Sequence, residues 1–106
     1  MKAPHYWRQG DVLIKRVASI PAEAKPKVRD NGRVILAYGE VTGHAHAITD
    51  EGAVLLTVAE SATFLRLSKG AQLIHEEHAS ITLPAGDYQI IRQQEYTPWG
   101  ERRVAD

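Results

Sequence analysis

The chain has 106 residues, of which 43% are hydrophobic, and this suits one soluble domain built around a single core. Thirteen Lys and Arg residues balance thirteen Asp and Glu residues, so the net charge of zero gives no attraction for nucleic acid or for an anionic membrane. The absence of cysteine excludes disulfides, thiolate metal sites and cysteine nucleophiles. We treat residues 1–106 as one domain.

No targeting or membrane-spanning pattern occurs in the sequence. The first residues lack the apolar stretch of a signal peptide, and no apolar run approaches the roughly 20 residues that a spanning helix needs. We therefore expect a cytoplasmic protein that makes no membrane contact.

Short strands and turns alternate along the whole chain. Residues 18–26 contain two prolines and predict a loop. Turns recur at short intervals without a sustained helical period, which predicts an all-β fold: a small β-barrel or a jelly-roll-like sandwich of short antiparallel strands. Apolar or alternating residues predict strands at 11–17, 53–58, 63–67, 71–75, 80–83, 88–95 and, at an edge, 101–105.

The clearest turn signal is Asn31-Gly32, which lies between residues 27–29 and 33–36. Both flanks contain apolar residues typical of strands. Asn-Gly favours a two-residue hairpin turn in which both central residues have positive φ. The sequence therefore predicts a β-hairpin centred on these two residues.

Two histidines lie two residues apart in the stretch 42–48, which otherwise resembles a strand. Side chains alternate across a strand, so His44, His46 and Ile48 share one face. Ile48 indicates that this face points inward. The Cα atoms of His44 and His46 are then roughly 6.6 Å apart, a spacing at which two imidazoles can bind one metal ion.

A second cluster, His75-Glu76-Glu77-His78, follows about thirty residues later. Along a regular strand His75 and Glu77 would face the core and His78 would face outward. A bulge or turn at Glu76-Glu77 would reverse this choice and bring in His78. A four-residue charged run of this kind is also typical of a solvated loop.

The two clusters together predict a metal site made of His44, His46 and one of His75 or His78. Glu77 or Glu51 would be a fourth ligand or a general base. Three imidazoles with an open position suit a divalent ion such as zinc, iron, manganese or nickel, and the sequence does not choose among them.

The segment 43–51, GHAHAITDE, resembles the first motif of the cupins, in which a glycine precedes HxH and a glutamate follows. The segment 84–86, Pro-Ala-Gly, resembles the PxG turn of the second cupin motif. This resemblance implies a small jelly-roll barrel with a metal ion held inside it by His44, His46 and Glu51.

Three positions depart from the cupin pattern: Gln89 stands where the second motif has its histidine, and His78 and Val58 stand where the two motifs have glycines. The third imidazole could then come from His75 or His78, outside cupin geometry. The chain is also similar to small uncharacterised bacterial and phage proteins that carry GHAH and HEEH segments, a resemblance that implies no activity.

Two functional interpretations follow. In the first, the chain is a metal-binding β-barrel that acts on or senses a small molecule. In the second, it is a non-catalytic interaction or structural module whose histidines are structural. Exposed strand edges make a homo-oligomer plausible in either case. A nucleic-acid function of the basic hairpin near Asn31 is disfavoured by the neutral overall charge.

Overall fold

The computed structural model describes residues 5–38, 44–59, 62–92, 94–97 and 100–103. These residues form twelve β-strands and no helix, so the prediction of an all-β fold is confirmed. No helix of the described chain is long and apolar enough to cross a membrane. Residues 42–43 of the expected histidine strand and 104–105 of the expected edge strand lie outside the described residues.

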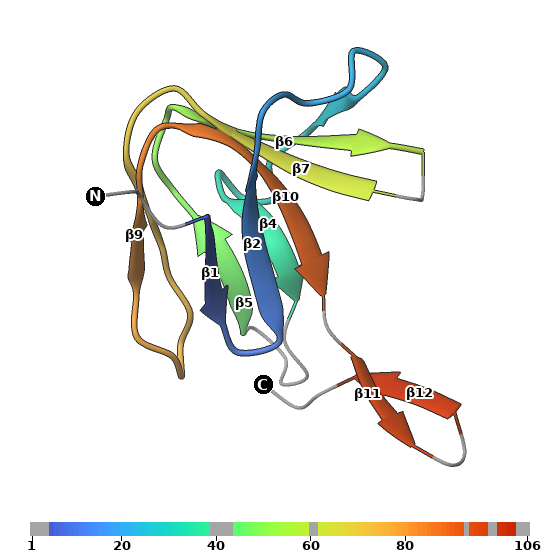
Figure 1. The fold of residues 1–106 in the computed structure, drawn as a ribbon. Helices are drawn as coiled ribbons and strands as arrows, with labels where there is room; N and C mark the ends of the chain where they lie inside the picture. The colour runs from blue at the N-terminus through green and yellow to red at the C-terminus, as the bar shows by residue number, and fades with distance from the viewer. Residues whose placement is uncertain (1–4, 39–43, 60–61, 93, 98–99, 104–106) are drawn as a thin grey trace.

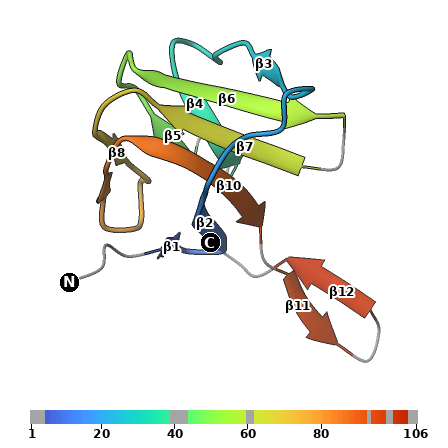
Figure 2. The same cartoon turned by 45° about the horizontal axis from the view of Figure 1, so that its top comes forward.

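Six antiparallel strands form the main sheet (Figures 1 and 2). The expected strand 11–17 occurs as β2, which pairs with the long strand β10 in the middle of this sheet. In order across the sheet, the strands are β1 (Tyr6–Gln9), β2 (Val12–Val17), β10 (Gly86–Arg92), β7 (Ala62–Leu67), β6 (Ala53–Val58) and β3 (Lys25–Lys27).

Two short hairpins make a second layer. One pairs β4 (Val34–Tyr38) with β5 (Ala45–Ile48), and the other pairs β8 (Ala71–Leu73) with β9 (Ile81–Leu83). A bridge between Ala47 and Ile74 connects the hairpins, because each amide nitrogen donates to the carbonyl of the other residue over 2.9 Å. Near the C-terminus, β11 (Gln94–Thr97) and β12 (Gly100–Arg103) form a separate hairpin.

The hydrophobic core draws on both layers, as expected when each layer has one apolar face. Along β2 and β10 the buried residues alternate with more exposed ones, which places one face of the sheet against the core. The larger core side chains are Val12, Ile14, Val34, Leu36, Ile48, Leu55, Leu65, Leu67, Leu73, Leu83, Tyr88 and Ile90.

The predicted Asn-Gly turn is present. Asn31 and Gly32 have φ values of 52° and 77°, and Asp30 and Arg33 exchange two backbone hydrogen bonds across the turn. The pairing does not continue into the preceding flank, because β3 pairs with β6 and not with β4. Pro26 and two lysines occupy β3, which is a common way to protect the edge of a sheet.

The strand ladders of the described residues do not close into a ring. The main sheet has two edges, β1 and β3, and the other ladders are two-stranded. The described residues therefore form an all-β fold of antiparallel sheets in two layers around a main core, and Ile20, Leu56 and Phe64 form a second, smaller buried cluster. Strand β1 was not predicted, because only four residues of weak alternation precede the turn at Gly10.

Candidate functional site

The two histidine clusters meet at one end of the molecule. His44 precedes β5, His46 lies within it, and His75 and His78 lie in the connection from β8 to β9. In Figure 1 this connection and the β1–β2 turn both lie at the lower side of the two layers, to the left of the β11–β12 hairpin. The ring centres are 4.4 Å apart for His46 and His75, 4.6 Å for His75 and His78, 5.9 Å for His46 and His78, and 5.8 Å for His44 and His75.

The chain bends at residues 76–78 after the short strand β8. The bend brings His78 into the cluster beside His75. The sequence left open which of these two histidines faces His46, and the structure places both rings against it. Two imidazoles that share a zinc ion have ring centres about 5 Å apart, because each nitrogen stands about 2 Å from the metal.

The ring of His46 is fully buried and is oriented by Gln9, the last residue of β1. Nε2 of Gln9 donates to the carbonyls of Leu73 and Ala79 over 3.1 and 2.9 Å, which fixes the orientation of the amide. Its Oε1 therefore accepts a hydrogen bond from Nδ1 of His46 over 2.8 Å. Since Nδ1 carries the proton, Nε2 is the nitrogen of the neutral His46 ring that offers a lone pair.

A carboxylate lies beside that nitrogen. Asp11 is 1% exposed, and its Oδ1 is 3.4 Å from Nε2 of His46. Its Oδ2 accepts a hydrogen bond of 2.6 Å from Nε of Arg92. A separation of 3.4 Å is long for a hydrogen bond but is about the distance between two ligand atoms on one tetrahedral zinc ion.

Nε2 of His78 is buried and has no hydrogen-bond partner among the described residues. It lies over Gly10, whose backbone has a φ of +58° in the β1–β2 turn. A Cβ on Gly10 would come within 2.8 Å of this nitrogen and within 3.2 Å of Cε1 of His46. The glycine thus gives both rings room to approach the turn that carries Gln9 and Asp11.

His75 has a different hydrogen-bonding state. The amide nitrogen of Glu77 donates to its Nδ1 over 3.0 Å, so the neutral ring carries its proton on Nε2. In this tautomer Nε2 of His75 is a donor and does not offer a lone pair to a metal ion. The ring nevertheless packs between His46, His78 and His44 and fills the centre of the cluster.

His44 lies at the outer side of the cluster, where its Nδ1 is 2.8 Å from Oε2 of Glu77. The neighbouring residue Glu76 accepts a hydrogen bond of 2.9 Å from the amide nitrogen of Ala45. This bond lowers the pKa of the Glu76 carboxyl below its usual value. Both carboxylates of the loop therefore fasten it to the start of β5.

Glu51 lies elsewhere. It is exposed in the turn between β5 and β6, and none of the described hydrogen bonds or ion pairs joins it to a histidine. Among the described residues, no three His, Asp or Glu side chains stand in the arrangement of a complete metal-binding group. The rings are close to one another, but their donor atoms do not converge as they stand.

The structure thus brings together His44, His46, His75, His78 and Glu77, which the sequence singled out. Gln9, Gly10 and Asp11 were not predicted as site residues, and Asp11 was counted only as the first residue of the expected strand 11–17. Two polar residues flanking a glycine are an ordinary turn signal, and nothing local indicates that they are buried. The sequence signal that could have found them is a carboxylate and an amide placed directly before the apolar residues of β2.

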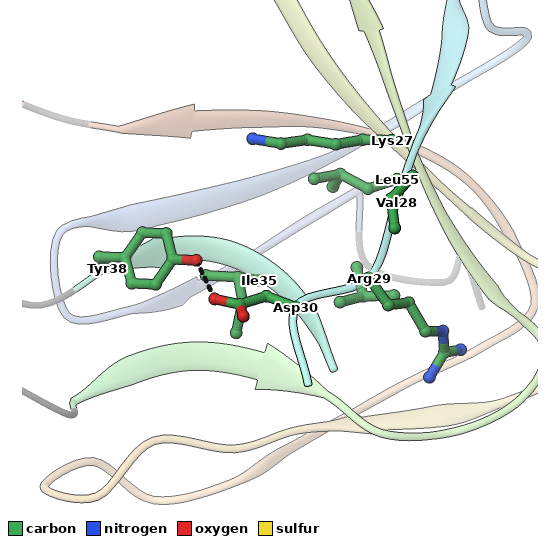
Figure 3. A pocket seen from close by; sticks show the side chains of 8 residues that line it. Lys27, Val28, Arg29, Asp30, Ile35, Tyr38 and Leu55 are labelled. Atoms are coloured by element: carbon green, nitrogen blue, oxygen red, sulfur yellow. Dashed lines mark hydrogen bonds between the residues drawn. The ribbon is translucent and has the colours of Figure 1, made fainter. Parts of the chain in front are cut away.

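A hollow also lies beside the Asn-Gly hairpin, where Lys27, Asp30 and Tyr38 surround it (Figure 3). The hydroxyl of Tyr38 donates to Asp30 across its mouth. The hollow has room of only about 30 Å³, which is enough for one or two water molecules and too small for a ligand.

Comparison with known proteins gives one match. Residues 8–93 match a family described as a domain of unknown function, DUF8820. No curated protein and no solved structure matches the chain. The matched family lends no support to the cupin resemblance.

Proposed function

The chain belongs to the DUF8820 family of domains of unknown function, and we propose from its own geometry that it binds a divalent metal ion. The ligands are Nε2 of His46, Nε2 of His78 and Oδ1 of Asp11. The observation that carries this proposal is the distance of 3.4 Å between Nε2 of His46 and Oδ1 of Asp11, both in buried side chains. The other polar atom of each side chain is already hydrogen-bonded, to Gln9 and to Arg92.

The hydrogen bonds made by the other polar atoms of His46 and Asp11 support this ligand set. Metal-binding histidines commonly donate their second ring nitrogen to a polar group, and metal-binding carboxylates are themselves hydrogen-bonded. Gln9 plays this part for His46, and Arg92 plays it for Asp11. In addition, the buried Nε2 of His78 has no hydrogen-bond partner among the described residues.

The donor set favours some metals over others. It contains two imidazoles and one carboxylate, and Arg92 neutralises part of the carboxylate charge. Imidazole suits zinc, iron or nickel, whereas magnesium and calcium prefer sets composed of oxygen atoms. We therefore expect a transition metal, with manganese the weakest of the four metals that the sequence allows.

Three protein ligands leave an open position on the ion, and this supports action on, or sensing of, a small molecule. A metal with an open position polarises an oxygen atom of its ligand or activates water. Of the two candidate carboxylates, Glu77 is the one bonded to a ring of the cluster, and it is half exposed. Glu77 is accordingly our candidate general base, and Glu51 has no supporting contact.

We further propose that the two layers form a jelly-roll-like sandwich. The common core of the main sheet and the two hairpins supports this topology. The proposed ligands differ from the cupin set, because His44 and Glu51 are replaced by Asp11 and His78.

A structural role for the histidines is the second candidate. The hydrogen bond from the Glu77 amide to His75 favours it, as does the absence of a ready-made metal-binding group among the residues that the structure describes. In this version a protonated His46 forms a buried ion pair with Asp11, and the cluster only holds the β8–β9 connection against β1 and β5.

Elemental analysis of the untagged, as-purified protein separates the two. We expect near-stoichiometric transition metal in the wild type and in His44→Ala, and loss of metal in His78→Ala and Asp11→Asn. His5→Ala is the matched control, since His5 is exposed outside the cluster. Sub-stoichiometric metal that does not rise when metal is added back would overturn the metal proposal and leave the structural role.

A further inference from the structure

A hollow of about 190 Å³ lies on the face of β5 that points away from the core. Ala45 and Ala47 line it, and they alternate along the strand with His46 and the core residue Ile48. Both alanines are almost fully buried, with 2% and 1% of their surface exposed. It holds about as much as six water molecules, which is room for a small metabolite.

Charged groups of opposite sign lie at the two ends of this hollow. Glu76 lies beside Ala45, whose amide nitrogen donates to its Oε1. Arg33 precedes Val34, which pairs with Ile48 at the other end of β5. Both side chains line the hollow. The guanidinium of Arg33 has no hydrogen bond or ion pair among the described residues, and so it can bind an anion.

The middle of the hollow is apolar. Ile74 bridges to Ala47 and is 40% exposed, so it presents an apolar surface to the hollow. His75 completes the lining, and its ring also contacts His46 and His78. A ligand in the hollow would therefore lie against the histidine cluster without entering it.

We propose that this hollow binds a small amphoteric molecule whose carboxylate and amine are separated by a short aliphatic chain. Arg33 binds the carboxylate, and a guanidinium matches its two oxygen atoms. Glu76 binds the ammonium group through the carboxylate oxygen that Ala45 does not hold. The exposed side chain of Ile74 contacts the aliphatic middle. This site does not depend on the proposed metal.

Amide NMR spectra of the metal-stripped full chain, titrated with γ-aminobutyrate, test the proposal. We expect progressive shifts of the amides of Ala45, Ala47, Ile74 and Glu76. Butyrate, butylamine and α-aminobutyrate are matched probes that lack one charge or carry both charged groups on the same carbon atom. Each should bind about tenfold or more weakly than γ-aminobutyrate, because one charge-assisted hydrogen bond is lost.

Variants assign the binding to the hollow. Ala47→Leu should abolish the shifts by filling the space, and Arg33→Gln and Glu76→Gln should each weaken binding about tenfold or more. Arg8→Gln removes the same charge from an exposed position on β1 and should change nothing. The absence of shifts would overturn the proposal. Equal binding of butyrate, or of α-aminobutyrate, would overturn the separated-charge class.

The same titration with zinc-loaded protein keeps the two proposals distinguishable. Binding of γ-aminobutyrate to stripped protein that takes up no metal supports the hollow and leaves the metal site refuted. Metal uptake without binding of γ-aminobutyrate refutes the hollow alone.

Discussion

Gly10 and the ring of His78 are so close that a methyl group on Gly10 would not fit between them. A Cβ on Gly10 would lie 2.8 Å from Nε2 of His78, a distance that real Cβ atoms essentially never adopt. Gly10 also has a φ of +58°, which costs an L-residue energy in addition to the contact. The β1–β2 turn and the β8–β9 connection, nearly seventy residues apart, are thus fitted to each other.

Gly10→Ala should lower the free energy of unfolding by about 2–3 kcal/mol, measured by urea denaturation, because it adds a steric contact to backbone strain. Gly32→Ala is the matched control. Its φ of +77° is similar, but no atom lies within 4 Å of its Cβ position. It should cost only about 1 kcal/mol. Equal losses in the two variants would show that the contact with His78 contributes nothing.

Gln9→Ala should destabilise the fold by about 2–4 kcal/mol, because it leaves the carbonyls of Leu73 and Ala79 and Nδ1 of His46 without their partner in a buried place. Gln72→Ala is a suitable control, since Gln72 is exposed on β8. Urea denaturation measures both. A loss below about 1 kcal/mol for Gln9→Ala would contradict the buried network.

Arg29→Lys should destabilise the fold by about 1–3 kcal/mol although it keeps the charge. The guanidinium of Arg29 donates to the carbonyls of Gly32, Thr49, Asp50 and Ala53, and an ammonium group cannot reach all four. Thermal unfolding, with Arg8→Lys as the exposed control, measures the effect. Equal melting temperatures of Arg29→Lys and the wild type would contradict it.

Tyr38 gives a prediction at alkaline pH. The hydrogen bond from its hydroxyl to Asp30 raises the pKa of Tyr38 above its usual value, because it favours the neutral phenol. The stabilisation is therefore fully present below the unfolded pKa of about 10 and is lost as the pH rises through the higher folded pKa.

An ultraviolet titration of the tyrosines checks this prediction. Asp30→Asn should move one tyrosine transition to lower pH, because the negative neighbour is removed. Tyr38→Phe identifies that transition by its disappearance. A titration curve that Asp30→Asn leaves unchanged would rule out the interaction.

Local patterns predicted most of the fold. The alternation in β2, β6 and β7 and the turn at Asn31-Gly32 are set by neighbouring residues, and these predictions are confirmed. The expected strand 88–95 is confirmed only in part, because β10 ends at Arg92 and residues 94–97 form β11 in a separate hairpin. The pairing of β3 with β6 was not predicted, because it depends on contacts between residues about thirty positions apart. Local chemistry favoured the alternative partner across the Asn-Gly turn.

The candidate site was only half predictable for the same reason. Histidine spacing identified the rings, but the partners of His46 come from Gln9 and Asp11 in another part of the chain. Whether His75 or His78 approaches His46 depended on a bend at residues 76–78 that period-two alternation cannot forecast. The role of Glu51 as a ligand or base stays a prediction without a supporting contact.

The ligand set is tested most directly by long-range ¹H–¹⁵N NMR spectra of the histidine rings, recorded for stripped protein before and after one equivalent of zinc is added. Zinc should move the Nε2 signals of His46 and His78 to values typical of a metal-bound nitrogen. His75 should keep its proton on Nε2, and His44 and His5 should not change. Unchanged spectra, or a shift of Nε2 of His44 in place of His78, would contradict the account.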